Sequence, residues 1–160
     1  MTAKTFPAKP PAKSVDFFVV MGYAVNTMAV QQYQRDEHRV HLVLYHLIFC
    51  PKRRKSVLVG STAKECERLI LEKCVQNNWQ ALNLSVEPDY VHLFVRVFPT
   101  NAAADVVKEL KAHTSHELRL KFPELKRRLP SLWTRSYLAS TAAKVSKDVI
   151  QQYIQAQKKS

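Results

Sequence analysis

Residues 88–95 read Pro88-Asp89-Tyr90-Val91-His92-Leu93-Phe94-Val95, a turn followed by a buried strand. Pro and Asp are frequent turn formers. Apolar residues then recur at every second position, the period of a β-strand. The positions between them carry Tyr90, His92, Phe94 and Arg96, so a phenol, an imidazole and a guanidinium share the opposite face of the strand. A purely structural strand has little use for these three groups together, which makes this face a candidate functional surface.

The composition suits one domain with a substantial core. The chain has 160 residues, 46% of them hydrophobic. Lys and Arg total 25 against 13 Asp and Glu, which gives a formal net charge of +12. This excess favours a polyanionic partner, with nucleic acid first and an anionic membrane second; the alternative is that the charge only confers solubility. No apolar run reaches the roughly 18 residues of a membrane-spanning helix, and we expect no membrane partner.

The three cysteines do not indicate a disulfide framework or a zinc site. Cys50, Cys66 and Cys74 are odd in number and no Cys-x-x-Cys spacing occurs. We interpret Cys66 and Cys74 as small buried side chains of one helix. A reducing compartment fits this usage, and we expect a cytoplasmic location.

The chain is expected to divide into an N-terminal extension at 1–38, partly disordered, and one domain at 39–160. Residues 1–13 are rich in Lys, Ala and Pro, which is typical of extended or disordered segments. The apolar run at 17–25 imitates a signal peptide, but Asp16 lies at its edge and no clear cleavage site follows.

The domain is predicted to be α+β, a ferredoxin-like βαββαβ sandwich with an extra C-terminal helix that carries Tyr153. The expected elements are a central strand at 40–50, a helix capped by Thr62 (in a capping box with Glu65) or by Ser61, a strand at 79–86, the strand at 90–97, a helix capped by Thr100 or Asn101 and running to about 122, a strand at 132–138, and a helix from Lys147 to about Lys158 capped by Ser146. In this fold the first and third strands are central neighbours, so the motif strand lies mid-sheet and the final helix can pack across its face.

Two basic clusters are candidates for phosphate binding. One follows the first strand directly at 52–55 and the other lies at 126–128. A solvated turn is the alternative for the first cluster, but its place beside a buried strand favours contacts with phosphates. The candidate DNA-binding residues are Lys52, Arg53, Arg54, Lys55, Lys108, Lys111, Arg119, Arg127, Arg128 and Arg135.

Other candidate residues have simple structural interpretations. His41 and His46, in the first strand, are interpreted as hydrogen-bonded strand histidines rather than metal ligands. Tyr153 belongs to a helical stripe with Ile150, Ile154 and Gln157, and an aromatic residue on such a stripe is usually part of the core.

The motif stretch nevertheless resembles the Pro-Asp-His-hydrophobic-His-Leu-Phe motif of the single-tyrosine HUH transposases, the TnpA type of the insertion-sequence 200/605 family, which includes the REP-associated tyrosine transposases. The resemblance spans about 39–157. The basic stretch after Cys50-Pro51 is similar to one in the family. Residues 132–137 resemble the family's Leu-Trp-Ser-Arg-Gly-Tyr.

This resemblance implies an enzyme that cleaves and rejoins single-stranded DNA through a 5′-phosphotyrosine intermediate. The family's nucleophile corresponds to Tyr153, and its three metal ligands correspond to Tyr90, His92 and Gln157. The expected cofactor is Mg or Mn. The expected partners are single-stranded or hairpin DNA and a second copy of the chain, because family members form dimers in which one subunit's tyrosine helix can complete the other's metal site.

Tyr90 stands where the family has the first histidine of its motif. A neutral phenol, with a pKa of about 10, is a weak ligand for a hard divalent ion, so metal binding is expected to be weak or absent. Two interpretations follow: a transposase, active or weakened, or a domesticated relative that binds DNA without cutting it. A third, an RRM-like RNA-binding sheet, is disfavoured because the aromatic- and Gly-rich RNP pattern is missing.

Overall fold

The computed structural model describes residues 33–35, 37–141 and 145–157. Most of the expected N-terminal extension, at 1–32 and 36, therefore lies outside the described residues, as does the expected helix end at Lys158. The described elements are β1 (Gln34–Arg35), β2 (Val40–His41), β3 (Val43–Phe49), the 3-10 turn η2 (Lys52–Arg54), α2 (Gly60–Gln76), β4 (Gln80–Glu87), β5 (Tyr90–Val97), α3 (Ala103–Lys121), α4 (Glu124–Arg128), β6 (Leu138–Ser140) and α5 (Lys147–Ala156). None of the helices in this part of the chain could span a membrane.

Four strands form one antiparallel sheet in the order β4-β5-β3-β6. The two central strands are β3 and β5, the first and third strands of this sheet in chain order. The helix α2 connects β3 to β4, and α3 precedes β6. This order of elements and strands is that of the ferredoxin-like βαββαβ sandwich, so the predicted α+β fold class is confirmed.

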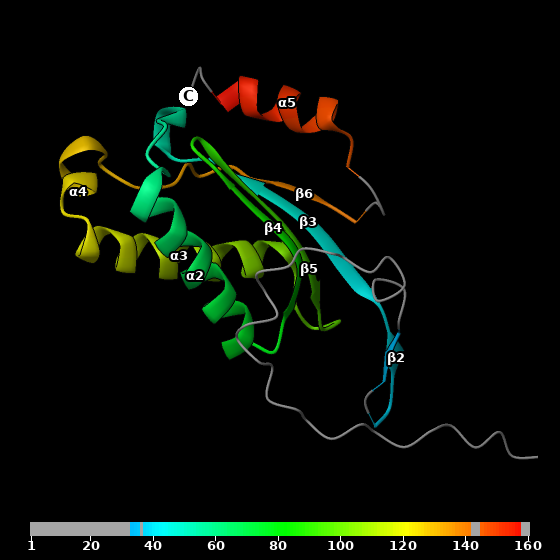
Figure 1. The fold of residues 1–160 in the computed structure, drawn as a ribbon. Helices are drawn as coiled ribbons and strands as arrows, with labels where there is room; N and C mark the ends of the chain where they lie inside the picture. The colour runs from blue at the N-terminus through cyan, green and yellow to red at the C-terminus, as the bar shows by residue number, and fades with distance from the viewer. Residues whose placement is uncertain (1–32, 36, 142–144, 158–160) are drawn as a thin grey trace, which may run out of the picture.

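The main core lies between the sheet and the helices α2 and α3, which cover the same face (Figure 1). Strand residues of one parity point into it, because side chains alternate between the two faces of a sheet. The largest buried contributors are Leu47, Phe49, Leu93, Leu69, Ile70, Leu110 and Leu118. Burial of each such side chain stabilises the fold by about 1.5–3 kcal/mol, so this layer holds the sheet rigid beneath the opposite face.

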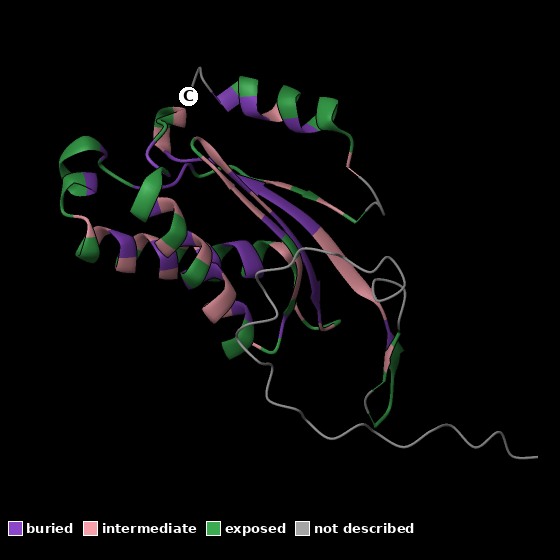
Figure 2. Ribbon diagram, viewed as in Figure 1, coloured by how far each residue is buried: buried purple, intermediate pink, exposed green. Residues whose placement is uncertain are grey.

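The opposite face of the sheet is covered by α5 alone among the described helices (Figure 2). Ile150 and Ile154 of α5 pack against Ile48 and Cys50 in a small second cluster. The helix begins as predicted, because the Ser146 hydroxyl accepts a hydrogen bond from a backbone N–H of the first turn. The short α5 is thus held on the sheet by few apolar contacts.

The last strand differs from its prediction. It runs from Leu138 to Ser140 rather than from 132 to 138. Trp133 makes only an isolated bridge to Pro51, and its Nε1 donates a hydrogen bond to Thr114 Oγ1 of α3 at 3.0 Å. Its ring also packs edge-on against Phe49, with centroids 4.9 Å apart. The apolar and aromatic content of this segment therefore serves packing beneath α3 and not strand pairing.

The predicted helix starts also need correction. Neither Ser61 nor Thr62 caps α2, which begins at Gly60 with no side-chain cap and buries Thr62 inside the helix. Neither Thr100 nor Asn101 caps α3, which begins at Ala103. The Asn101 side chain instead accepts hydrogen bonds from Trp79 Nε1 and from the backbone N–H of Phe98. A tertiary contact with an indole thus outcompetes the local cap.

Two further boundaries depart from the predictions. The strand expected at 40–50 is divided at Leu42, because β2 leaves the main sheet to pair with β1. Residues 124–128, which include the basic cluster at 126–128, form the short helix α4, which the sequence did not predict; its Leu125 is buried in the main core.

Candidate active site

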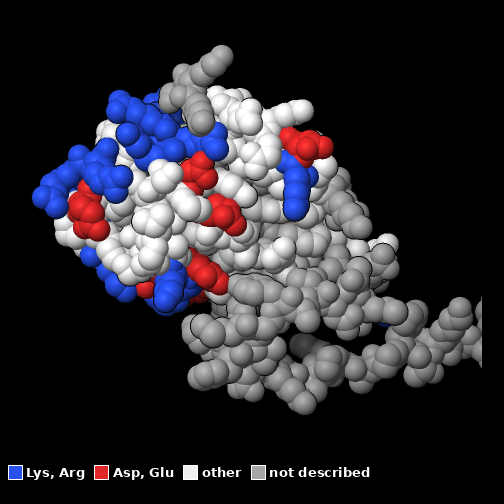
Figure 3. Space-filling model, turned by 45° about the horizontal axis from the view of Figure 1, so that its top comes forward, with Lys and Arg blue, Asp and Glu red and all other residues white. Residues whose placement is uncertain are grey.

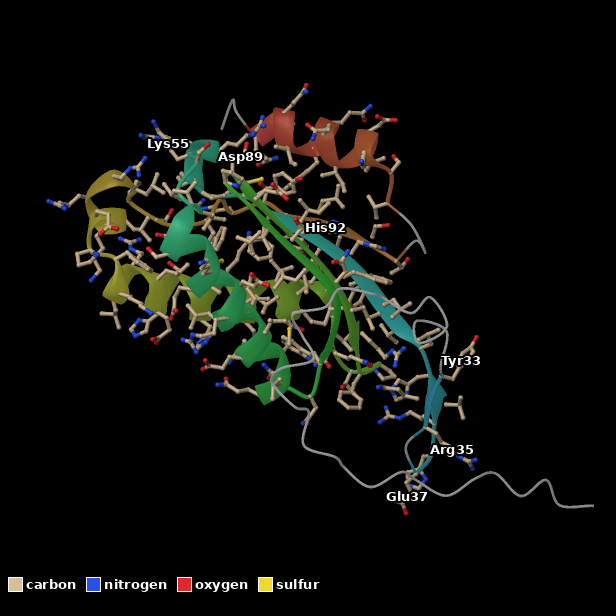
Figure 4. All side chains as sticks on the ribbon, in the orientation of Figure 1. Tyr33, Arg35, Glu37, Lys55, Asp89 and His92 are labelled. Carbon is tan, nitrogen blue, oxygen red and sulfur yellow. The ribbon has the colours of Figure 1, made fainter. Side chains whose placement is uncertain are left out.

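The sheet face towards α5 carries the polar side chains of β5. Strand parity places Tyr90, His92, Phe94 and Arg96 on this face. The neighbouring strand β3 adds His46, because His46 is the register partner of Phe94. Figure 4 shows His92 on β5, below α5. The predicted polar face therefore exists, and it has a second imidazole.

The two histidines of this face are in direct contact. His46 Nδ1 and His92 Nε2 lie 3.1 Å apart, a hydrogen-bond distance. The His46 ring also stacks on Phe94, with ring centroids 4.1 Å apart. Burial lowers the pKa of His92, and the nearby His46 adds to the shift, so the His92 imidazole is neutral at pH 7. The prediction that His46 is a hydrogen-bonded strand histidine is confirmed.

His41 behaves differently from His46. It is buried and packs against the Phe98 ring, with centroids 5.8 Å apart. Neither of its ring nitrogens has a hydrogen-bond partner in the described part of the chain. The prediction of a hydrogen-bonded His41 is therefore wrong, because apolar packing takes the place of the expected partner.

Tyr153 lies half-buried on α5 and packs against the small cluster that includes Cys50. Burial raises the pKa of its phenol to about 12, and the Ser136 hydroxyl acts in the opposite direction. Within the described residues the Tyr153 hydroxyl makes no hydrogen bond of good geometry. The phenol is thus neutral at pH 7, and its oxygen is not committed to a structural contact.

Ser136 connects the end of α5 to the segment before β6. Its hydroxyl donates a hydrogen bond to Gln157 Oε1, and Gln157 is buried. Lys111 Nζ, from α3, donates to the backbone carbonyls of Thr134 and Ser136 at 3.0 and 2.8 Å. Burial lowers the pKa of Lys111 to about 8. These bonds fix Ser136 beside both Gln157 and Tyr153.

The basic turn η2 is joined to the turn of the motif by a short ion pair. Arg54 Nε donates to Asp89 Oδ2 at 2.6 Å, and the two side chains are only 15% and 21% exposed. Arg53 and Arg54 both have left-handed backbones, with φ of 55° and 49°. Such residues persist only where their surroundings fix them. The ion pair supplies this constraint for Arg54 and keeps the basic turn beside Tyr90.

The sequence matches a family model described as "Transposase IS200 like" over residues 39–157. The match covers the whole sheet and α5. The chain belongs to the IS200-like transposase family. The family is one of DNA transposases, so the resemblance of the motif stretch is confirmed.

Individual members of the IS200-like family agree with this assignment. The ISDra2 transposase TnpA of Deinococcus radiodurans is 35% identical over 120 residues, which are 74% of this chain and 86% of that protein. The transposase for insertion sequence element IS200 of Salmonella typhimurium is 27% identical over 115 residues, 71% of this chain and 75% of that protein. A crystal structure of a transposase from Deinococcus radiodurans R1 superposes with a TM-score of 0.72 at 34% identity, over 78% of this chain and 97% of that one.

The expected metal ligands of this IS200-like transposase are only partly suited to an ion. Burial raises the pKa of the Tyr90 phenol, and Glu87 and Asp89 add to the shift, so Tyr90 stays neutral. Gln157 Oε1 already accepts the hydrogen of Ser136. In the ranges 33–35, 37–141 and 145–157, no three His, Cys, Asp or Glu side chains form a group that could hold an ion. His92 is thus the single imidazole of the expected set.

The basic residues of the transposase gather at the end of the molecule that carries η2 and α4 (Figure 3). Six of the ten candidates are exposed: Arg53, Lys55, Lys108, Arg127, Arg128 and Arg135. Lys52 is partly exposed. Arg54 pairs with Asp89, and Arg119 Nη1 donates to the carbonyl of Pro130 at 3.1 Å. The inward bonds of Lys111 argue against its expected phosphate contact.

Three residues at the site were missed as functional candidates. Asp89 was expected in the turn and off the motif face, although its carboxylate holds Arg54. Ser136 stands where the family's Leu-Trp-Ser-Arg-Gly-Tyr has glycine, and that departure was the available signal. His46 gave no such signal, because its nearness to His92 depends on the pairing register of β3 and β5.

Proposed function

We propose that this transposase cleaves and rejoins single-stranded DNA through a covalent bond between Tyr153 and a 5′-phosphate. The observation that carries the proposal is the position of Tyr153. Its uncommitted hydroxyl lies on the α5 side of the sheet, in the same small cluster as Tyr90 at the start of the motif strand. The exposed cations around η2 and α4 supply the surface on which a DNA backbone is held.

The reaction is a transesterification at phosphorus. The Tyr153 oxygen attacks the phosphodiester, the bond from phosphorus to the 3′-oxygen breaks, and the proton lost by the phenol balances the one gained by the released 3′-hydroxyl. The ester energy is retained in the phosphotyrosine, so the strand can be rejoined to a new 3′-hydroxyl without a cofactor that supplies energy. We expect Arg54 to favour an anionic phosphate at this end of the sheet, because it adds a cation beside the motif turn.

A divalent Mg or Mn ion, when bound, would neutralise a non-bridging phosphate oxygen. His92 is the residue of the expected set whose neutral imidazole fits such an ion. The second candidate function, DNA binding without cleavage, is favoured by the phenol at position 90 and by the hydrogen bond that engages Gln157. The two candidates share the DNA partner and differ only in the covalent step.

We further propose that the transposase acts as a homodimer, as the family resemblance implies. In this chain α5 packs on its own sheet through Ile150 and Ile154, an arrangement in which each subunit carries its own tyrosine. The mass of the protein in solution, measured by light scattering, tests the dimer directly. The cytoplasmic location stays a prediction.

The covalent step is tested with a pool of end-labelled single strands and hairpins incubated with the protein and manganese. A denaturing gel should show a labelled band that migrates with the protein and disappears after protease digestion. If the protein shifts the same DNA on a native gel but yields no such band, the function is DNA binding alone.

Binding to single-stranded DNA should weaken steeply with salt. Each phosphate contact adds about 0.7 to the slope of log K against log salt. Replacing Arg53 and Lys55 by Gln should weaken binding across all sequences and reduce the slope by roughly 1.4. Arg68→Gln is the matched control, because Arg68 already pairs with Glu65 and Glu72. A slope near zero for the unmodified protein would contradict a nucleic-acid role.

The rate of adduct formation should rise with pH. The pKa of Tyr153 is raised to about 12, so the phenolate is a small fraction at neutral pH and grows about tenfold per pH unit below that value. We therefore expect single-turnover rates to increase from pH 6 to 9 without a plateau. A rate that stops rising at pH 7 would show that another group removes the proton of the Tyr153 phenol. The pKa of Tyr153 would then not set the pH dependence of adduct formation.

A further inference from the structure

The His46–His92 contact has the geometry of a chelating pair as well as that of a hydrogen bond. Nitrogen ligands bind Zn²⁺ and similar ions at about 2.0–2.1 Å, so two of them at 90–110° around one ion are about 2.8–3.4 Å apart. The separation of His46 Nδ1 and His92 Nε2 is 3.1 Å. An ion can take the place of the shared proton when both rings turn, because its position lies to the side of the line that joins the two nitrogens.

The surroundings hold both rings near this position. His46 is 7% exposed, and its ring stacks on Phe94 at an interplanar angle of 8°. His92 is on the adjacent central strand, where it is the register partner of Ile48. Rings fixed by packing lose little further freedom when they bind an ion.

Tyr90 is poorly suited to the same task. Its phenol is kept neutral by burial and by the carboxylates of Glu87 and Asp89. It packs instead with the apolar cluster beneath α5. The residue that stands beside His92 as a second nitrogen donor therefore comes from β3 and not from the motif.

We propose that His46 Nδ1 and His92 Nε2 together bind a divalent transition-metal ion, with His46 supplying the imidazole that the motif lacks at Tyr90. This inference rests on the proposed function for its role, because it provides the ion that the covalent step would use. Imidazole pairs favour borderline ions such as Co²⁺, Ni²⁺ and Zn²⁺ over Mg²⁺. Water, and Gln157 when Ser136 releases it, would complete the coordination.

The test is a titration of the DNA-free protein with Co²⁺, followed by its visible absorption and by calorimetry. Wild-type protein should bind one ion per chain, and Mg²⁺ should give no heat. His46→Gln and His92→Gln should each weaken binding by tenfold or more. Tyr90→Phe should leave the affinity unchanged, as should His41→Gln, which alters a buried strand histidine that makes no contact with either ring in the described structure.

The inference would be overturned if wild-type protein did not bind Co²⁺, or if His46→Gln bound it with unchanged affinity. It would also be overturned if Tyr90→Phe lost as much Co²⁺ affinity as His46→Gln, or if His41→Gln lost tenfold in Co²⁺ affinity.

If His46→Gln fails to fold, the imidazole ¹⁵N resonances of wild-type protein with Zn²⁺ decide instead. Shifted resonances of His46 Nδ1 and His92 Nε2 support the pair, and an unshifted His46 Nδ1 resonance refutes it. Adduct formation without Co²⁺ binding refutes the pair and leaves the proposed function standing. Binding at the pair without an adduct supports the inference and refutes the covalent step.

Discussion

Tyr153→Phe should abolish the covalent DNA adduct, a loss on the order of a thousandfold or more, because the substitution removes only the attacking oxygen. The ring can keep its packing against the cluster around Cys50. Since the hydroxyl makes no hydrogen bond of good geometry in the described structure, its removal should change the free energy of unfolding by less than about 1 kcal/mol. DNA binding should be nearly unchanged. The measurements are a denaturing gel, a native gel and thermal unfolding.

Tyr137→Phe and Tyr90→Phe are the matched controls for this loss. Both tyrosines lie near the site, and both variants should still form adduct if Tyr153 is the nucleophile. An adduct that persists in Tyr153→Phe but disappears in either control would move the nucleophile to that residue. Unfolding of Tyr153→Phe would show that the hydroxyl has a structural role. This result would support the interpretation of Tyr153 as a core aromatic residue.

Tyr90→His should strengthen the metal site. Tyr90 and His92 are two residues apart on the same face of β5, so a histidine at 90 would stand beside His92 and offer another nitrogen. Manganese affinity, measured by calorimetry, should rise by about tenfold or more, equivalent to about 1.4 kcal/mol. Lost packing of the phenol ring against the α5 cluster should offset only part of this gain. DNA cleavage should rise or appear with the metal.

Other outcomes of Tyr90→His discriminate between the accounts. If Tyr90→His leaves the manganese affinity unchanged, and wild-type protein already binds manganese tightly and cleaves DNA efficiently, then Tyr90 does not weaken the metal site. Metal binding without any cleavage would favour the DNA-binding relative. Combining Tyr90→His with His46→Gln adds a sharper comparison: the new histidine should recover binding that His46→Gln loses, because both supply an imidazole beside His92.

The fold was predictable because most of its signals are local. The period-two pattern at 91–97 and the stripe of Ile150 and Ile154 each follow from one element's own burial, and the structure confirms both. The segment at 132–138 was mispredicted for the opposite reason. The apolar side chain of Trp133 is buried through contacts with α3 and Phe49, which no local periodicity encodes.

The site was predictable only where one strand or helix carried it. Tyr90 and His92 are neighbours on β5, so parity sufficed to place them on one face. The contacts of His46 with His92, of Ser136 with Gln157 and of Arg54 with Asp89 each join segments separated by 46, 21 and 35 residues. Such contacts depend on strand register and helix docking, which one sequence does not specify. Residue types alone therefore predicted candidate site residues but not the side chains that contact them.

The central claim, covalent catalysis by Tyr153, is tested most directly by mapping the DNA-linked peptide. The candidate tyrosines fall in different tryptic peptides: Tyr153 in 148–158, Tyr90 in 74–96 and Tyr137 in 136–144. After incubation with single-stranded DNA, nuclease and trypsin digestion, mass spectrometry should find a nucleotide attached through phosphate to the peptide 148–158. A nucleotide on 74–96 or 136–144, or none on any peptide from protein that binds the DNA, would contradict the account.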